Sequence, residues 1–271
     1  MPRFAANLAY LFTERPLLER FAAAAAAGFT AVELQSPYDH RAADIRREIE
    51  RHGLTILGIN TPPAPGAETG LAAVPGREQE FAALFGRALD FATAIGGRTI
   101  HCMSGKVPPD RTCEAESVFV ANLGRAADLA GEKGLGLLIE PLNHRDRPDY
   151  VLHLPEQAAA IIERVGRANV RMQFDFYHAQ IQAGDLFTRF ARHLAVIGHV
   201  QVAAVPSRAE PDEGEVNYAA VFQMIDRSGY DGWVGCEYRP RGRTEDGFGW
   251  GRAYGLGGRM AAPDAEKLIR P

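Results

Sequence analysis

The chain has 271 residues, of which 46% are hydrophobic and 24% are charged, as in an ordinary globular protein. Its formal net charge of −4 provides no overall positive field that would attract nucleic acid or an anionic membrane. The three cysteines are too few and too scattered for a disulfide framework or a CxxC site, which indicates a reducing, cytoplasmic compartment.

The first residues show no targeting or membrane-spanning pattern. The apolar run MPRFAANLAYLF lacks the basic start and the cleavage pattern of a signal peptide. The alanine-rich stretch at residues 22–27 is far shorter than the roughly 20 residues that cross a bilayer. It predicts a helix interior instead, because alanine is the best helix former. We therefore expect a soluble protein with no membrane partner.

Further along, short apolar runs alternate with longer stretches of helical periodicity. The predicted strands lie at residues 3–8, 31–34, 55–59, 99–103, 136–140, 170–175, 197–203 and 232–237. The predicted helices lie at residues 17–27, 42–52, 77–95, 115–133, 155–165, 186–193 and 218–228, with a last one at residues 264–269. Glycines just past six of these helices indicate left-handed helix ends, at Gly28, Gly53, Gly96, Gly134, Gly166 and Gly229.

This alternation predicts an α/β fold, a (β/α)₈ TIM barrel, as a single domain over residues 1–271 with a C-terminal extension from about residue 251. An open doubly wound sheet would give a similar order of elements. Eight units in this length favour closure, and no GxGxxG or GxxxxGK[ST] fingerprint follows a strand. Two irregular segments, at residues 60–75 and 239–258, would lie on the C-terminal face, where active-site loops gather.

Polar residues stand at or near the ends of the last four predicted strands. These residues are Glu140, Asp175, Gln201 and Glu237. Carboxylates that meet at one barrel mouth would repel one another unless a divalent cation lay between them. Three carboxylates and an amide oxygen favour Mg²⁺ or Mn²⁺ over zinc. The sequence therefore predicts a metal held by these four residues. The alternative is that each caps a local loop or pairs with an arginine, such as Arg147, Arg171, Arg208 or Arg239.

Other residues near the predicted mouth are candidates for substrate binding. His178, three residues after Asp175, is a further metal ligand, a partner of a ligand, or a histidine hydrogen-bonded at the rim. An acidic substrate would need a cation, for which Lys106 and Arg208 are best placed, although each also fits a solvated surface charge. Asn7 is expected to line the pocket from the first strand. Glu33 is expected to line the pocket from the second strand, and His101 could reach the pocket or lie in the core. His199 alternates with Gln201 and could support the metal from beneath or be a core histidine.

Glu140 and Glu237 also suit proton chemistry. Moving a carbonyl between adjacent carbons requires the removal of a proton from one carbon and the return of a proton to its neighbour. Because the two glutamates follow the fifth and the eighth strands, they approach the centre from different sides. They could therefore act as a general base and a general acid on one bound substrate.

Several specific motifs occur together along nearly the whole chain, up to about Trp250. They are RFAANL at residues 3–8, SPYD at 36–39, VPGRE at 74–78, LLIEPLNH at 137–144, QFDFYHAQ at 173–180, GHVQVA at 198–203, EPDEGEVNY at 210–218 and GWVGCEYRPRG at 232–242. In this combination the chain resembles the hydroxypyruvate isomerase family of the xylose-isomerase-like TIM barrels, which includes the similar 2-oxo-tetronate isomerases. The resemblance implies a metal at Glu140, Asp175, Gln201 and Glu237, with Glu140 and Glu237 as the proton donor and acceptor.

Within this family the motifs point to two substrates. EPLNH at residues 140–144 favours hydroxypyruvate, which would be converted to tartronate semialdehyde through an enediolate. The opening MPRFAANL, EPDEGEVNY and the closing PRGRTEDGFGW favour 2-oxo-tetronate as the alternative. A ketose 3-epimerase is more remote, as is an abasic-site endonuclease, which would need a histidine where Gln201 stands. The family often associates through barrel faces, so a homo-oligomer is expected.

Overall fold

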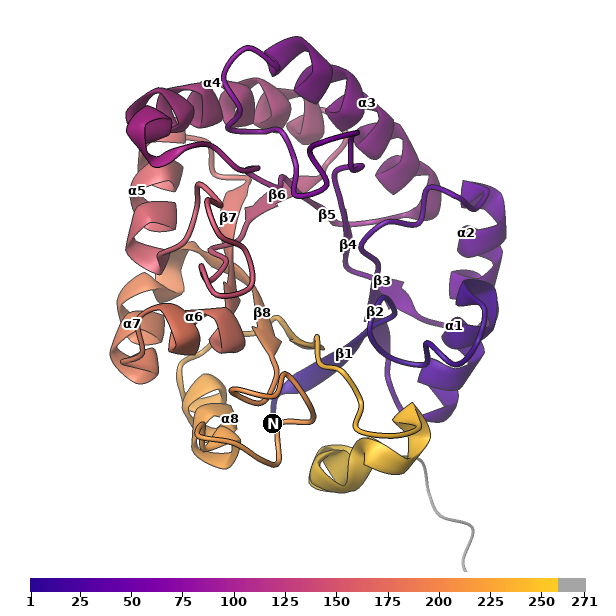
Figure 1. Cartoon of the computed structure of the whole chain (residues 1–271). Coiled ribbons are helices and arrows are strands. Elements are labelled where there is room, and N and C mark those ends of the chain that lie inside the picture. Colours follow the sequence, from indigo (N-terminus) through magenta and orange to yellow (C-terminus); the bar gives the residue numbers. More distant parts are fainter. Residues whose placement is uncertain (258–271) are drawn as a thin grey trace, which may run out of the picture.

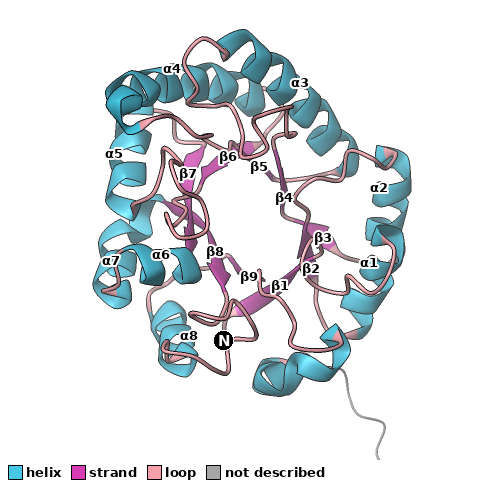
Figure 2. Cartoon of the chain, in the orientation of Figure 1, coloured by secondary structure: helices cyan, strands magenta, loops and turns pink. Residues whose placement is uncertain are grey.

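The computed structural model describes residues 1–257 and contains one parallel sheet in the order β3-β2-β1-β9-β8-β7-β6-β5-β4. Figures 1 and 2 show these strands as a ring with helices around it. The predicted TIM barrel is therefore confirmed. The strands are β1 (Arg3–Asn7), β2 (Ala31–Glu33), β3 (Thr55–Ile56), β4 (Gly58–Asn60), β5 (Thr99–His101), β6 (Gly136–Ile139), β7 (Val170–Asp175), β8 (Ile197–Val202) and β9 (Trp233–Cys236).

The helices form the outer layer, and the six predicted left-handed glycines all have positive φ. Gly96 and Gly166 are themselves helix C-caps. The helices are α1 (Leu17–Ala26), α2 (Ala42–Arg51), α3 (Glu78–Ile95), α4 (Thr112–Gly131), α5 (Pro155–Val165), α6 (Phe176–Gln182), α7 (Leu186–His193) and α8 (Tyr218–Arg227), with short 3₁₀ segments at Pro109–Arg111, Leu194–Val196 and Thr244–Tyr254.

One predicted strand, at residues 55–59, is interrupted. β3 pairs with β2 and β4 pairs with β5, and Leu57 lies between them. The carbonyl of Leu57 accepts the backbone N–H of Thr99, while its own N–H is donated to Val32. A Cβ at Gly58 would overlap the Thr99 side chain, so glycine permits the close approach of β5. The third strand of the barrel is thus split so that its two halves bond to opposite neighbours.

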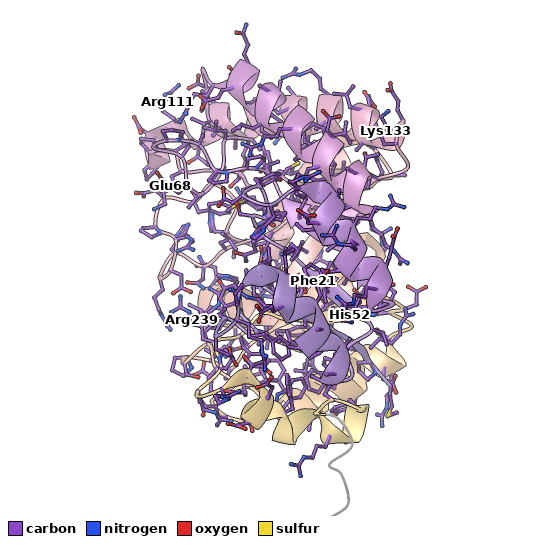
Figure 3. All side chains as sticks on the ribbon, turned by 90° about the vertical axis from the view of Figure 1, so that its right-hand side faces the viewer. Phe21, His52, Glu68, Arg111, Lys133 and Arg239 are labelled. Carbon is purple, nitrogen blue, oxygen red and sulfur yellow. The ribbon has the colours of Figure 1, made fainter. Side chains whose placement is uncertain are left out.

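The main hydrophobic core lies between the strands and the helices. Each helix turns an apolar stripe inward, as in α2, where Ile45 and Ile49 are buried four residues apart. In the side view, Glu68, Arg111 and Arg239 lie at one end of the barrel, and His52 and Lys133 lie at the other (Figure 3). Because Glu68 and Arg239 belong to loops after strands, the first end is the one at which active-site loops gather.

Four helical elements were not predicted, among them the short 3₁₀ segments at Pro109–Arg111 and Leu194–Val196. Helix α6 follows β7 directly, and a 3₁₀ segment covers Thr244–Tyr254 after β9. Trp250 and Tyr254 of this segment both pack on Phe4 of β1, with ring centroids 5.2 Å apart in each case. The helix predicted at residues 264–269 lies outside the described residues. Within residues 1–257, no helix is both long and apolar enough to span a membrane.

Candidate active site

The four predicted strand-end residues all lie buried at the C-terminal face of the barrel. Glu140 directly follows β6, Asp175 ends β7, Gln201 is the fifth residue of β8, and Glu237 directly follows β9. Each is at most 5% exposed. A carboxylate is this deeply buried only where other groups compensate for the loss of its hydration. The barrel thus concentrates acidic groups that the chain separates by up to 97 residues, from Glu140 to Glu237.

Asp175 shows how the local sequence orients one of these groups. It is both the last residue of β7 and the N-cap of α6, and its Oδ1 accepts the backbone N–H of Tyr177 at 2.8 Å. This capping bond satisfies one of the N–H groups that a helix start leaves without a partner. The other oxygen, Oδ2, is buried and has no hydrogen-bond partner among the described residues. One half of the carboxylate therefore holds the helix, and the other half faces the site.

A group that could hold a metal ion is formed by Glu140, Asp175 and His178, whose ligand atoms lie within 4.8 Å of one another. The predicted set instead contained Gln201 and Glu237 beside the first two residues. In the described structure, Glu140 Oε1, Asp175 Oδ2 and Glu237 Oε2 are buried without hydrogen-bond partners. Buried carboxylate oxygens of this kind fit a hard divalent cation, which Glu140 and Asp175 could hold together, whereas Glu237 does not belong to the group whose ligand atoms lie this close.

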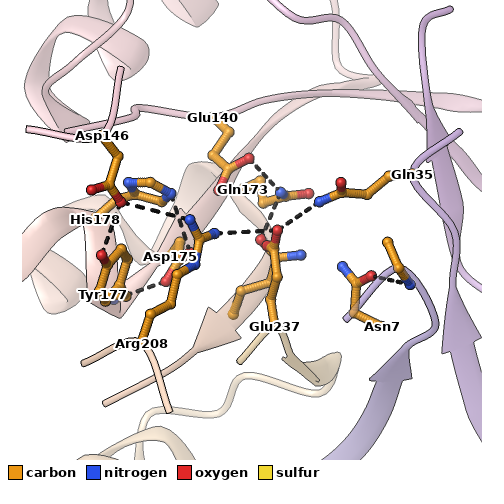
Figure 4. Close-up of polar contacts among 12 residues, drawn as sticks. Asn7, Gln35, Glu140, Asp146, Gln173, Asp175, Tyr177, His178, Arg208 and Glu237 are labelled. Atoms are coloured by element: carbon orange, nitrogen blue, oxygen red, sulfur yellow. Dashed lines mark hydrogen bonds and ion pairs between the residues drawn. The ribbon is translucent and has the colours of Figure 1, made fainter. Parts of the chain in front are cut away.

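Glu237 is engaged by two donors outside this group. Its Oε1 accepts the side-chain amide of Gln35 at 2.6 Å and lies 3.4 Å from the Arg208 guanidinium (Figure 4). Gln35 comes from the loop after β2, 202 residues earlier in the chain. The second oxygen of Glu237, Oε2, is buried and has no hydrogen-bond partner among residues 1–257. The Glu237 carboxylate thus lies beside the Arg208 guanidinium, the buried cation of the mouth.

Arg208 is a buried cation held in a defined position. Its guanidinium lies 4.8 Å from the ring centre of Tyr177 and 5.0 Å from that of Tyr10, and 3.7 Å from Asp146 (Figure 4). Its backbone has a positive φ of 59°, which is uncommon for a residue with a side chain. The Arg208 N–H is donated to Ala204, and the N–H of Arg239 is donated to the Arg208 carbonyl. Backbone conformations of this kind cluster at functional sites.

His178 is held as a neutral hydrogen-bond donor. Its Nδ1 accepts the backbone N–H of Asn143 at 3.1 Å and lies 2.7 Å from the Asn143 side-chain amide. Burial and the nearby Arg208 hold the pKa of His178 well below its ordinary value. Since Nδ1 accepts, the single proton of the neutral ring lies on Nε2, which is 3.8 Å from Asp175. In this tautomer Nε2 offers an N–H to an oxygen in the site, and His178 could join Glu140 and Asp175 in binding a metal only after Nε2 loses that proton.

The carboxyl groups share a common electrostatic environment. Burial raises the pKa of Glu140 well above its ordinary value, and the charges of Glu237 and Asp175 raise it further. Burial likewise raises the pKa of Glu237 to about 8 and that of Asp175 to about 6, although Arg208 opposes both shifts. Without a cation, the mouth therefore favours protonated carboxyls at pH values where free carboxyls are ionised.

The remaining candidates for substrate binding, Asn7 and Lys106, differ in how deeply they are buried. Asn7 is buried at the end of β1, and its Oδ1 accepts the backbone N–H of Ala9 while its Nδ2 has no partner among the described residues. Lys106, in the loop after β5, is exposed and, within residues 1–257, forms no ion pair with the site carboxylates. Five residues that contact the site were not predicted, namely Tyr10, Gln35, Asn143, Asp146 and Gln173. Only Gln173 carried a signal, because it lies two residues before Asp175 and so faces the same side of β7.

The raised pKa values predict how the metal-free protein responds to pH. A carboxyl with a raised folded-state pKa binds more protons in the folded protein than in the unfolded protein. The free energy of unfolding of the protein therefore falls as the pH rises. Thermal unfolding of metal-free protein should therefore shift to lower temperature between about pH 5 and pH 8, the window that the pKa values of Asp175 and Glu237 define. Added Mn²⁺ should restore stability most at pH 8, because its ligands must be deprotonated. A metal-free Tm that rises through this window would contradict the prediction.

Comparison with known proteins identifies the class of protein to which this fold belongs. The family model of the xylose isomerase-like TIM barrel matches residues 21–254. The crystal structure titled AP endonuclease, family 2 from Brucella melitensis superposes with a TM-score of 0.91 at 46% identity, covering 94% of this chain and 99% of that chain. The protein is thus a xylose isomerase-like TIM barrel.

Sequence relatives narrow the class further. A 2-oxo-tetronate isomerase of Cupriavidus necator is 48% identical over 257 residues, which cover 94% of this chain and 99% of that protein. A putative hydroxypyruvate isomerase of Homo sapiens is 44% identical over 262 residues, which cover 93% of this chain and 95% of that protein. The chain therefore belongs to the family of hydroxypyruvate and 2-oxo-tetronate isomerases, and it is an isomerase.

Proposed function

We propose that the protein interconverts 2-oxo-tetronate and its 3-oxo isomer, with Glu140 and Glu237 as the proton-transferring pair. The observation that carries the proposal is that each glutamate is buried at the mouth with one oxygen free of protein donors. A carboxylate oxygen in this state can take a proton from carbon or return one to it.

The reaction requires no oxidant. One glutamate removes the proton on C3, the electron pair forms the C2–C3 double bond of an enediolate, and the other glutamate delivers a proton to C2. The hydroxyl proton of C3 moves to the oxygen of C2, so that the carbonyl has shifted by one carbon. Glu140 and Glu237 follow strands β6 and β9, which are not neighbours in the sheet, so they can act from two sides of one substrate.

A divalent cation, Mg²⁺ or Mn²⁺, bound at the acidic group would supply positive charge that polarises the carbonyl oxygen. The residues proposed to hold it are Glu140, Asp175, Gln201 and Glu237. All four offer an oxygen, which suits a hard cation. His178, with its proton on Nε2, is proposed instead to donate a hydrogen bond to a substrate oxygen.

Arg208 is proposed to bind the substrate carboxylate. Its position between two tyrosine rings presents the planar guanidinium to the mouth, where it can form paired hydrogen bonds. Asn7 has a free amide N–H group directed from β1 and is proposed to contact a substrate hydroxyl. Lys106 is proposed as a second, exposed cation that attracts the acid from solution.

The choice of substrate rests on the relatives. Sequence motifs ranked hydroxypyruvate first and 2-oxo-tetronate as the alternative, but the 2-oxo-tetronate isomerase is 48% identical and the putative hydroxypyruvate isomerase 44% identical. The larger identity favours the alternative. The two acids share the carboxylate and the adjacent carbonyl and differ in length by one hydroxymethylene group, so the same machinery can process both at different rates.

Proton NMR of metal-stripped protein with each acid tests the proposal. We expect turnover only after addition of Mg²⁺ or Mn²⁺, and a kcat/KM at least about tenfold higher for 2-oxo-tetronate, since one carbon group in a pocket is worth about 10- to 200-fold. In D₂O the product should carry solvent deuterium at the protonated carbon. Faster turnover of hydroxypyruvate would transfer the assignment to that acid. Turnover of neither acid with any metal would refute the proposal and direct the test to ketose epimerisation.

A further inference from the structure

Beneath the mouth, the interior of the barrel is polar. TIM barrels usually fill this region with layers of branched apolar side chains. Here the interior holds Glu33, His101, Gln173, His199 and Gln201, each at most 6% exposed. They line a small cavity of about 30 Å³. Such a layer is stable only if its polar groups satisfy one another, which gives each hydrogen bond in it a defined direction.

The hydrogen bonds form a chain from Glu33 to Glu140. Gln201 Nε2 donates to Glu33 Oε2 at 2.7 Å, and Gln201 Oε1 accepts from Gln173 Nε2, also at 2.7 Å. The same Gln173 nitrogen donates to Glu140 Oε2 at 2.8 Å (Figure 4). An ionised carboxylate only accepts hydrogen bonds, so a charged Glu33 fixes the direction of the Gln201 amide. Gln201 thus turns its nitrogen toward Glu33 and its oxygen toward the side of Glu140.

Two neighbours border the Glu33 carboxylate. His199 Nε2 lies 3.2 Å from the other oxygen, Glu33 Oε1. On strand β9, a Cβ at Gly235 would overlap that same oxygen. Glycine at this position therefore leaves the space that the carboxylate occupies. The placement of the Glu33 carboxylate beside Gln201 therefore requires the missing side chain at Gly235, while Oε1 itself accepts no hydrogen bond from the described residues.

We propose that Glu33 is a positioning residue that holds the Gln201 amide with its oxygen, rather than its nitrogen, directed to the acidic group at the mouth. The inference rests on the proposed function, in which Gln201 offers that oxygen to a divalent cation. The amide oxygen has two acceptor sites, and Gln173 occupies one of them. Without Glu33 only the hydrogen bond from Gln173 opposes a half-turn of the amide, which would present N–H groups that repel a cation.

A general negative field from Glu33 is the competing explanation, and two substitutions separate the two. Glu33→Gln removes the charge but keeps an oxygen that can accept from Gln201. Glu33→Met removes the acceptor at similar size. Gly235→Ala would place a Cβ against the Glu33 carboxylate and against Cγ of Gln201, so it disturbs the pair without changing the charge of Glu33 but does not by itself distinguish the two residues. Circular dichroism and metal-free Tm values show whether each variant folds.

The test is the Mn²⁺ dissociation constant of metal-stripped protein, measured by calorimetry or by the electron paramagnetic resonance of free Mn²⁺. Loss of a group that orients a metal ligand costs about 10- to 100-fold in affinity, which we expect for Glu33→Met and Gly235→Ala. Glu33→Gln should bind Mn²⁺ nearly as tightly as the unmodified protein. In a Gln201→Glu background, Glu33→Met should no longer weaken binding, because a carboxylate has two equivalent oxygens and needs no such orientation.

Unchanged Mn²⁺ affinity in Glu33→Met would overturn the inference, while turnover by the unmodified protein would leave the proposed function standing. Glu33→Gln and Glu33→Met could instead weaken Mn²⁺ binding equally, and also in the Gln201→Glu background. That result would show that Glu33 acts through its negative charge and not by orienting the Gln201 amide. If the unmodified protein binds Mn²⁺ as expected but turns over neither acid, the proposed function fails and the inference stands. Absence of Mn²⁺ binding by the unmodified protein would overturn both.

Discussion

Replacing Glu140 or Glu237 by glutamine should lower kcat of the metal-loaded protein on 2-oxo-tetronate by about 10²- to 10⁴-fold, the usual contribution of a positioned acid or base. Glutamine keeps the size of the side chain but cannot exchange a proton in this range of pH. Each variant also loses an oxygen that has no protein partner. Steady-state rates by NMR, taken at saturating Mn²⁺, measure the loss that remains after metal binding is restored.

Deuterium exchange separates the two glutamates. The variant that lacks the base should fail to exchange the substrate proton with D₂O, whereas the variant that lacks the acid can still exchange it without forming product. Glu14→Gln is a matched control, because Glu14 is an exposed carboxylate on the same face that accepts hydrogen bonds from Thr244. Retention of kcat within about tenfold in either site variant would exclude that glutamate from the required pair.

Replacing Arg208 by lysine should lower kcat/KM by about 10- to 100-fold, since a hydrogen bond to a charged group contributes about 1.5–3 kcal/mol. Lysine keeps the charge but loses the planar donor pair and the stacking between Tyr10 and Tyr177. Lysine would also have to adopt the positive φ of this position. We expect the loss to appear mainly in KM, because the contact with the substrate carboxylate is present before and during the reaction.

Arg239→Lys provides the matched control for Arg208. Arg239 is an exposed cation on the same rim, and its described hydrogen bond to Arg208 uses only backbone atoms. Its replacement should change kcat/KM little. If Arg208→Lys and Arg239→Lys have equal kcat/KM values, the mouth needs only a positive charge at Arg208. The proposed paired hydrogen bonds from Arg208 to the substrate carboxylate would then be wrong. Measurement with both acids also shows whether Arg208 contributes to the choice between them.

The polar interior connects Gln201, a proposed metal ligand, with Glu140, a proposed proton carrier. Gln173 donates to Glu140 and to Gln201 with the same nitrogen, so any movement of Gln201 changes a hydrogen bond to a proposed proton carrier. His101, whose pKa burial lowers to about 3, lies 3.7 Å from Glu140 as a neutral ring. It therefore adds no positive charge that would oppose cation binding. The interior thus favours a compact acidic mouth with Arg208 as its buried cation.

Much of this arrangement could be predicted from the sequence. Strands and helices follow from local periodicity, and Glu140, Asp175 and Glu237 end apolar strands, so parallel strands must bring them to one face. Alternation along a strand also places Gln173 beside Asp175 and His199 beside Gln201. These features depend on the direction of each side chain relative to its own backbone, which a short stretch of residues determines by itself.

Other features depended on closure of the barrel. The split at Leu57 arises where β5 approaches Gly58, and the contact of Gln35 with Glu237 joins residues 202 positions apart. The contacts of Arg208 with Tyr10 and Tyr177 require two loops and helix α6 to meet. Sequence alone determined which residues face the interior and which strand ends carry charge. Only the tertiary structure decided which of them touch, because contact distances depend on how far apart closure leaves strands that are distant in the chain.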